Sequence, residues 1–408
     1  MKTKPQNNDL GGRAPLKSMF FLLLISLFFQ GCTAVTEYRF SGNQLKKKAL
    51  VPMEEYRVCV LGFDPDNKHF YTLVLRVENG KKVLVFEKRD AKGNVVSSTN
   101  LPFFPLWFSE SIRSSLSGEK LVYTFSDPIK SSDWVQMKST GGWITKTLHH
   151  EYVSIYDLNK KKVLTTWSTK DEKQKKIAGY KLTNLSVEYP VFYTKDKVAF
   201  VLKSYYSSLA TREEIQKMDP RDYAIIPMMI ISKSESGERQ MIFKQDESIF
   251  SYHLTGIPAK EMLFFVAEID ENPPSIWSFK NGDKKAKLFF TIDRLERVVD
   301  MKASPDGKRL ALLCKRTRTD SEDQIVYVFD IQTKKQIQRF FLKESTAPCF
   351  RLFFLGNDKI ILNSGAENRD RYYVDIYNAK TGAFILRKKI NRHLNATSSD
   401  GKRFLVEP

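Results

Sequence analysis

The residues able to do acid–base or metal chemistry are scattered along this chain of 408 residues. The histidines are His69, His149, His150, His253 and His393, and only His149 and His150 are neighbours. Consecutive strand residues point to opposite faces, so one metal ion could hardly take both, and a polar loop is the simpler interpretation. No Gly-x-Ser-x-Gly elbow and no phosphate-binding P-loop occurs. We therefore expect no metal, no cofactor and no catalytic residue of a known motif.

The segment Asp64–Asn67 (DPDN) begins like a calcium-binding loop. The later ligand positions and the bidentate glutamate of such a loop do not follow it. A tight turn is the better interpretation, because similar turns recur along the chain.

Two long polar and aromatic inserts, at about residues 128–150 and 207–223, offer a candidate binding surface. Arginine and aromatic side chains are over-represented where binding energy concentrates, and loops on a rigid scaffold often carry function. The candidate partner-binding residues are Trp134, Trp143, His149, His150, Arg212, Arg221 and Tyr223. The alternative is that the inserts fold down as a lid without a partner.

The stretch Val298–Leu342 shows which elements must position these inserts. It predicts four short strands, Val298–Ala303, Lys308–Lys315, Gln324–Ile331 and Gln336–Leu342. Ser304–Gly307 (SPDG) joins the first two as a type I turn, with proline at its second position and glycine at its fourth. One such sheet cannot bury both of its faces alone, so it needs copies of itself.

The chain supplies these copies at a spacing of about 40–50 residues, which is typical of β-propellers. The turn between first and second strands recurs near Asp64, Ser117, Thr194, Pro258, Ser304, Gly356 and Ser399. The last unit stops after two strands, and Glu37–Phe40 with Lys48–Met53 could supply the missing two. We therefore predict an all-β protein, a seven-bladed β-propeller closed by N- and C-terminal strands that share one blade. Six or eight blades are the alternatives.

Two pairs of segments carry a resemblance to a known family. SPDGKRLALL at Ser304–Leu313 and SSDGKRFLV at Ser398–Val406 resemble the second-strand signature of TolB-like (WD40-like) bacterial propellers. YVFDIQTKK at Tyr327–Lys335 and VDIYNAKTG at Val374–Gly382 resemble the following strand and turn. The resemblance implies the fold and leaves the function open, because one fold hosts many activities.

The first 31 residues have the pattern of a bacterial export signal. A basic segment precedes the apolar run Met19–Phe29, whose 11 residues are too few to span a bilayer comfortably. Gly31 and Cys32 then resemble a lipoprotein lipobox, which would make Cys32 the lipidated first residue of a mature domain over residues 32–408. The alternatives are an ordinary signal peptide or an uncleaved anchor. We expect an exported protein, held by lipid at a bacterial cell membrane on its periplasmic or surface side.

The net charge of +19 would suit an anionic partner. No basic run is interleaved with stacking aromatic residues as in single-strand binders, so we expect no nucleic acid. The remaining cysteines, Cys59, Cys314 and Cys349, fall in predicted strands. Buried thiols are the preferred interpretation, although export would permit a disulfide.

These observations lead to three functional hypotheses. The first is a non-catalytic propeller, tethered in the cell envelope, that serves as an interaction scaffold for a protein partner. The second is a binder of carbohydrate or of an anionic polymer through the inserts. The third is an enzyme with a dispersed site in the central channel. We prefer the first, because a rigid ring offers a broad face for a partner and a lipid would hold it at a membrane. The third is disfavoured, because prolyl-oligopeptidase-type enzymes also need an α/β-hydrolase domain, for which the chain has no room.

Overall fold

The structure is a computed structural model, and it describes most of the chain from residue 34 onward. The described residues are 34–41, 44–52, 58–64, 66–101, 114–126, 134–139, 142–147, 151–169, 176–177, 180–181, 184–205, 228–245, 249–251, 253–269, 272–316, 323–342, 348–366, 371–390 and 393–406. The predicted export signal and Cys32 lie outside them. Among the described residues, no helix has the length and hydropathy needed to cross a membrane.

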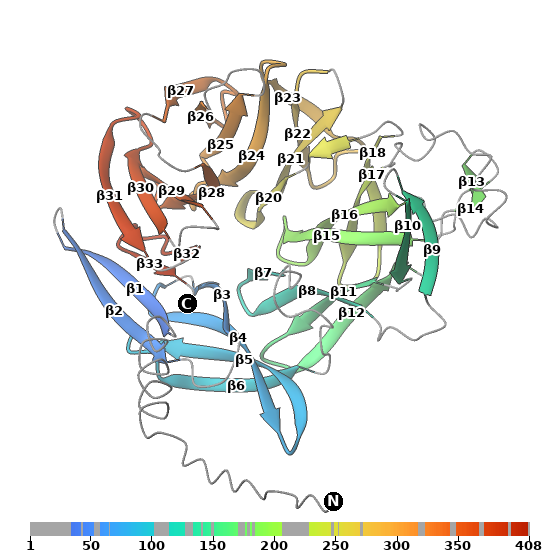
Figure 1. Ribbon diagram of the computed structural model, residues 1–408, viewed down its shortest axis with the longest axis horizontal. Coiled ribbons are helices and arrows are strands. Elements are labelled where there is room, and N and C mark those ends of the chain that lie inside the picture. Colours follow the sequence, from blue (N-terminus) through green and yellow to red (C-terminus); the bar gives the residue numbers. More distant parts are fainter. Residues whose placement is uncertain are drawn as a thin grey trace, which may run out of the picture.

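Seven antiparallel sheets, the blades, stand around a common centre (Figure 1). Blade 1 contains β3 (Val58–Phe63), β4 (His69–Glu78), β5 (Lys81–Asp90) and β6 (Val95–Leu101). Blade 2 contains β7 (Ser114–Ser117), β8 (Lys120–Ser126), β11 (Glu151–Asp157) and β12 (Lys162–Ser168). Blade 3 contains β15 (Asn184–Phe192), β16 (Lys197–Tyr205), β17 (Met228–Ser234) and β18 (Arg239–Gln245).

The remaining blades repeat this order. Blade 4 contains β20 (Leu254–Ile257), β21 (Met262–Ile269), β22 (Ser275–Lys280) and β23 (Lys287–Thr291), with β19 (Ile249–Ser251) also paired to β21 and the 3-10 turn η4 (Pro258–Lys260) after β20. Blade 5 contains β24 (Glu296–Ala303), β25 (Arg309–Arg316), β26 (Gln324–Asp330) and β27 (Gln336–Phe341). Blade 6 contains β28 (Cys349–Leu355), β29 (Lys359–Ala366), β30 (Arg371–Asn378) and β31 (Phe384–Ile390). Blade 7 contains β32 (Leu394–Thr397), β33 (Arg403–Val406), β1 (Ala34–Ser41) and β2 (Gln44–Pro52).

Two short hairpins lie outside the blades. The strands β9 (Trp134–Ser139) and β10 (Gly142–Thr147) form a hairpin between β8 and β11, within the first predicted insert. The strands β13 (Lys176–Ile177) and β14 (Tyr180–Lys181) form a smaller hairpin before blade 3.

The first strands of the blades contact one another in a closed circle, in the order β3, β7, β15, β20, β24, β28, β32 and back to β3. The circle is completed by blade 7, in which β1 pairs with β33 and places Tyr38 opposite Phe404. Their rings stack with centroids 5.0 Å apart. The predicted seven blades and the shared last blade are therefore confirmed.

The apolar core is divided among the junctions between blades. Seven buried apolar clusters occur among the described residues, one at each junction. Strand β25 shows why, because Leu310 and Leu312 pack toward blade 4 while Ala311 and Leu313 pack toward blade 6. A strand buried on both faces reads as a continuous apolar run, as it does here. The three described cysteines pack in this way without a disulfide, with Cys314 and Cys349 buried and Cys59 partly buried.

Loss of an aromatic side chain at the closing blade tests whether the ring behaves as one unit. Phe404 is fully buried. We expect Phe404→Ala to lower the free energy of unfolding by about 3–5 kcal/mol, because it removes a large core side chain from the blade that joins the two ends. Denaturant unfolding followed by fluorescence and circular dichroism measures this change.

The matched control is Phe384→Ala, since Phe384 lies on the outer strand β31 and is 55% exposed. The control should change stability by no more than about 0.5 kcal/mol. An unchanged unfolding transition for Phe404→Ala would contradict closure through blade 7.

Candidate functional site

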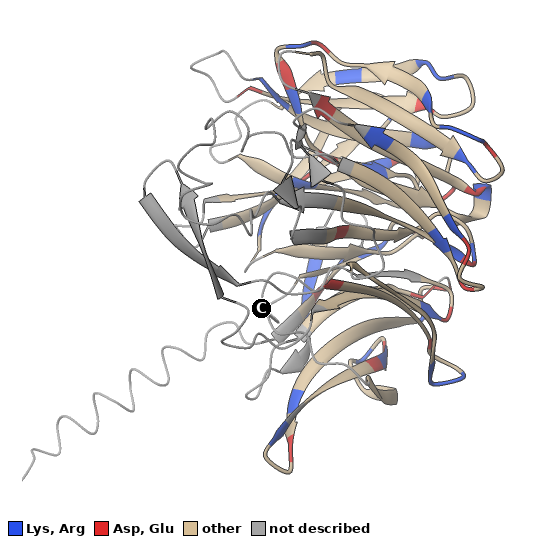
Figure 2. Cartoon of the chain, turned by 90° about the vertical axis from the view of Figure 1, so that its right-hand side faces the viewer, with Lys and Arg blue, Asp and Glu red and all other residues tan. Residues whose placement is uncertain are grey.

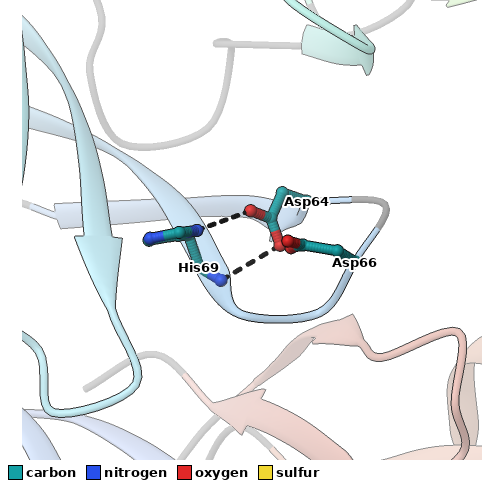
Figure 3. Close-up of side chains that lie close together, drawn as sticks. All are labelled: Asp64, Asp66 and His69. Carbon is teal, nitrogen blue, oxygen red and sulfur yellow. Dashed lines mark hydrogen bonds and ion pairs between the residues drawn. The ribbon is translucent and has the colours of Figure 1, made fainter.

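One group of His and Asp side chains among the described residues has a geometry that could hold a metal ion: Asp64, Asp66 and His69 (Figure 3). They lie in and beside the turn between β3 and β4, and their ligand atoms are all within 4.8 Å of one another. The His69 Nδ1 atom is 2.8 Å from Asp64 Oδ2, and the His69 backbone N–H donates to Asp64 Oδ1 at 3.0 Å. Asp66 Oδ1 accepts the backbone N–H of Lys68 at 3.0 Å.

The same hydrogen bonds recur in two other turns, with serine in place of Asp64. Ser304 Oγ accepts the backbone N–H of Arg309 at 2.9 Å, and Asp306 Oδ1 accepts that of Lys308 at 3.0 Å. Ser398 and Asp400 repeat the arrangement in blade 7. Asp64 and Asp66 therefore cap a turn, as the sequence predicted, and this capping accounts for their proximity without an ion.

The insert residues predicted to bind a partner are mostly outside the described part of the chain. His149, His150, Arg212, Arg221 and Tyr223 all lie there. The first insert does connect the second and third strands of blade 2, and residues 206–227 connect those of blade 3.

Within the described hairpin, Trp134 begins β9 opposite Thr147, and Trp143 lies in β10 opposite Lys138. Binding through the inserts stays a prediction.

The inner strands of the ring show a second arrangement of polar groups. Each of these strands is the edge strand of its sheet, so alternate backbone N–H groups point away from the ladder. In four of the strands a side chain of the preceding blade accepts such an N–H. The pairs are Val187 to Glu151, Val298 to Glu268, Leu352 to Asp300 and Leu394 to Asn363.

These four contacts lie at one end of the blades, which we call the insert face. It is the end where each second strand runs on to the third and each fourth strand runs on to the next blade. The opposite end, which we call the turn face, carries the tight turns between first and second and between third and fourth strands.

Glu268 differs from Asp300 and Asn363 because only one of its oxygens is engaged. Its Oε1 accepts the Val298 N–H, while its buried Oε2 has no hydrogen-bond partner in the described part of the structure. Asp300, by contrast, accepts the N–H of Leu352 on one oxygen and that of Met301 on the other. The Glu268 side chain is 4% exposed.

Burial raises the pKa of Glu268 to about 7, against the opposing effects of the Val298 N–H and the charge of Arg297. A carboxyl group with this pKa exists in both protonation states at neutral pH, as a general acid or base requires.

His253, directly before β20 at the start of blade 4, is also hydrogen-bonded to Val298. The backbone of Val298 hydrogen-bonds its imidazole and favours the protonated form, as does the charge of Asp300. Burial, aided by Lys302, outweighs both and lowers the pKa of His253 below 6.5. At neutral pH the ring is therefore mainly uncharged.

Two cations lie on β24 beside these groups. Arg297 is exposed, and Lys302 is half-buried with its Nζ 3.5 Å from Asp300 Oδ1. Glu268, His253, Arg297 and Lys302 together form what we call the Val298 site. A group with an ionisable acid, a neutral imidazole and two cations can bind an anion and move a proton beside it.

No sequence motif marks the Val298 site. Its residues come from the end of one strand, from the approach to another and from a third, in two blades. The one local signal is Glu268 itself, a carboxylate at the end of the apolar strand Met262–Ile269 (MLFFVAEI). Burying a charged residue in such an apolar run costs free energy unless the charge is paired or hydrogen-bonded.

Comparison with solved structures supports the fold. No family model matches the chain, and no curated protein matches it in sequence. An oligogalacturonate lyase in complex with manganese is 14% identical with a TM-score of 0.50, covering 91% of this chain and 89% of the lyase. An oligogalacturonate lyase from Vibrio parahaemolyticus is 12% identical with a TM-score of 0.52, covering 88% and 85%. A protein assigned as TolB from Agrobacterium tumefaciens is 10% identical with a TM-score of 0.41, covering 91% and 96%.

The chain is thus a seven-bladed β-propeller, in the same fold class as these proteins. The prediction of a non-catalytic scaffold is wrong. It relied on the lack of a motif and of a hydrolase domain, and the two lyases share this fold over most of their length. A propeller can therefore carry an enzyme site without either feature, because residues from several blades can converge on it.

The ionisation of Glu268 predicts how stability depends on pH. The folded pKa of about 7 lies above the ordinary value of 4.5, so the folded protein binds more protons and the wild type loses stability as pH rises between these values. Glu268→Gln removes this cost while its amide oxygen can still accept the Val298 N–H. We expect the variant to be more stable by about 3 kcal/mol above pH 7 and nearly equal to wild type below pH 4.5.

Urea titration at a series of pH values measures this difference. The control is Glu261→Gln, an exposed carboxylate in the same blade, which should show no such pH dependence. A difference between Glu268→Gln and wild type that is independent of pH would show that the carboxyl group does not titrate in this range.

Proposed function

We propose that the protein is a propeller enzyme that acts on an acidic saccharide at the Val298 site. In this proposal Glu268 is the general base that removes a proton beside the sugar carboxylate. Arg297 and Lys302 bind that carboxylate, and His253 positions the substrate through a hydrogen bond. The observation that carries the proposal is the buried Glu268 oxygen that no described group engages.

The electrostatics of the site suit this chemistry. Cations beside a uronate carboxylate neutralise its charge and stabilise the negative charge that develops when the neighbouring proton leaves. A base with a pKa near the working pH combines a useful ionised fraction with enough basicity. The uncharged His253 adds no positive charge that would hold Glu268 permanently ionised.

The fold is compatible with such a reaction, since the two similar propellers named above are oligogalacturonate lyases. At 12–14% identity they support the architecture alone. The choice of an acidic saccharide therefore depends on the cations of the site and on the net charge of +19.

Cleavage assays on acidic oligosaccharides test the proposal. Loss of the C5 proton to Glu268 and cleavage of the C4–O glycosidic bond form a C4=C5 double bond, and the departing oxygen takes up a proton from water. The unsaturated sugar absorbs ultraviolet light, so a panel of uronate oligosaccharides can be followed directly. We expect turnover to rise with pH through about 7 as Glu268 ionises, and Glu268→Gln to lower kcat by about 100-fold or more.

Glu261→Gln should retain full turnover because this carboxylate lies at the turn face. Wild-type rates in Glu268→Gln would rule out the assigned base. No product from any uronate, together with hydrolysis of a neutral substrate, would rule out the substrate class.

We also propose that the protein is exported and anchored by lipid at Cys32, close to the start of β1 at Ala34. The support is the sequence alone, a basic segment and an apolar run that end at Gly31 and Cys32. One acyl chain gives weak membrane binding, whereas several give stable anchoring.

Cys32→Ser should move the protein from the membrane fraction to the soluble fraction after cell disruption. Cys59→Ser, a cysteine in β3, is the control and should stay with the membrane. Continued sedimentation of Cys32→Ser with membranes would argue against lipidation.

A further inference from the structure

The turn face, opposite the Val298 site, has an uneven distribution of charge. Figure 2 shows Lys and Arg gathered at the tips of the blades on the right-hand side, with fewer Asp and Glu among them. The turns account for much of this pattern, because their aspartates accept backbone hydrogen bonds while many of their lysines are exposed.

The aspartates of this face are engaged in the backbone of the turns. Asp306 Oδ1 accepts the N–H of Lys308 and the hydroxyl of Ser304. Asp330 Oδ1 accepts the N–H of Thr333 at 2.7 Å and its hydroxyl at 2.9 Å. These contacts lower the pKa of Asp330, with the Thr333 backbone as the largest cause, so it stays ionised in the turn. Some lysines of this face are engaged as well, such as Lys120 with Glu235 and Lys197 with Asn281, whereas others are exposed without an ion pair among the described residues.

On blades 4 and 5 the lysines of the turns form what we call the basic strip. Its members are Lys260, Lys284, Lys285, Lys308, Lys334 and Lys335. All but the half-buried Lys260 are exposed. Lys284, Lys285, Lys334 and Lys335 form no ion pair with any other described residue.

The strip is continuous across the junction between the two blades. The Lys260 side chain reaches blade 5, since a Cβ atom added to Gly307 would lie 3.3 Å from it. Its charge also contributes to the lowered pKa of Asp330. The Lys308 carbonyl accepts the N–H of Ile331 at 2.9 Å, which joins the two turns of blade 5.

Acids do lie near the strip, and each has a partner. Glu261 Oε2 accepts the side-chain amide of Asn281 at 3.0 Å, and Asp283 pairs with Lys287 at 2.9 Å. The free lysines therefore keep a positive field above the turns of these two blades.

Blade 1 differs, which indicates the shape of the partner. Its turns carry Asp64, Asp66 and Asp90 against Lys68, Lys88 and Lys92, so the charges balance there, and Lys88 is paired with Asp64. A flat anionic bilayer would press on every blade and would gain no attraction from this one. A chain laid across blades 4 and 5 would avoid it.

We propose that the basic strip binds an elongated acidic polysaccharide, as a second site on the face opposite the Val298 site. Lysine is a compact charge on a flexible stem without the fork of arginine, so it suits a repeating row of carboxylates or sulfates better than one fixed group. Each contact is weak and screened by salt, and their number provides the affinity.

Binding of fluorescent polygalacturonate to the full chain tests the strip. We expect the fourfold variant Lys284→Ala, Lys285→Ala, Lys334→Ala and Lys335→Ala to bind about tenfold more weakly at low salt. The salt dependence of its affinity should also be shallower. The control with the same loss of charge on other blades is Lys46→Ala, Lys48→Ala, Lys161→Ala and Lys162→Ala, which should bind nearly as wild type.

Dextran as a neutral polymer should not bind. Equal weakening by both fourfold variants would overturn the proposal in favour of a general effect of net charge. Binding to vesicles of phosphatidylglycerol and phosphatidylcholine without binding to polygalacturonate would overturn it in favour of a membrane.

Failure here is distinct from failure of the proposed enzyme. Glu268→Gln should bind polygalacturonate as tightly as wild type, because Glu268 lies at the other end of the ring. The strip variant should cleave short acidic oligosaccharides at the wild-type rate. A loss of short-substrate turnover in the strip variant would contradict a separate second site.

Discussion

The ring depends on how the innermost strand of each blade satisfies its free backbone groups. An inner strand has a ladder partner on one side only, so alternate backbone N–H groups of the strand point away from its sheet. A buried N–H without an acceptor costs free energy comparable to that of a lost hydrogen bond. The preceding blade provides the acceptor through Glu151, Glu268, Asp300 or Asn363. Neighbouring blades are thus joined by directional bonds as well as by apolar clusters.

This requirement also explains why a carboxylate can be buried at the Val298 site. Asp300 and Asn363 use both of their polar atoms in the framework, whereas Glu268 uses one. A side chain recruited for structure therefore keeps an atom available for chemistry. The cost of burial is also what brings its pKa into the neutral range.

Much of the fold could be predicted because most blades are formed by one continuous stretch of the sequence. The turn Ser304–Gly307 and the apolar run after it determine two strands and the direction between them, and the observed β25 begins at Arg309, one residue from the expected boundary. The closing blade was also predictable, since two strands were missing at one end and two were spare at the other. The Val298 site was not, because its parts are separated in sequence and meet only after blades 4 and 5 pack together. Asp64, Asp66 and His69 are the opposite case. They are close in sequence and resemble a metal site, but the hydrogen bonds of the turn explain their arrangement.

Blade 7 also determines when the molecule can be completed. Glu37 and Arg403 meet in it although they are 366 positions apart. A ribosome must therefore deliver nearly the whole chain before β1 can pair with β33, and until then two open sheet edges face solvent. Such edges invite pairing with other chains. A prematurely terminated product would remain an open arc that proteases can attack. Only the full-length chain forms the closed ring.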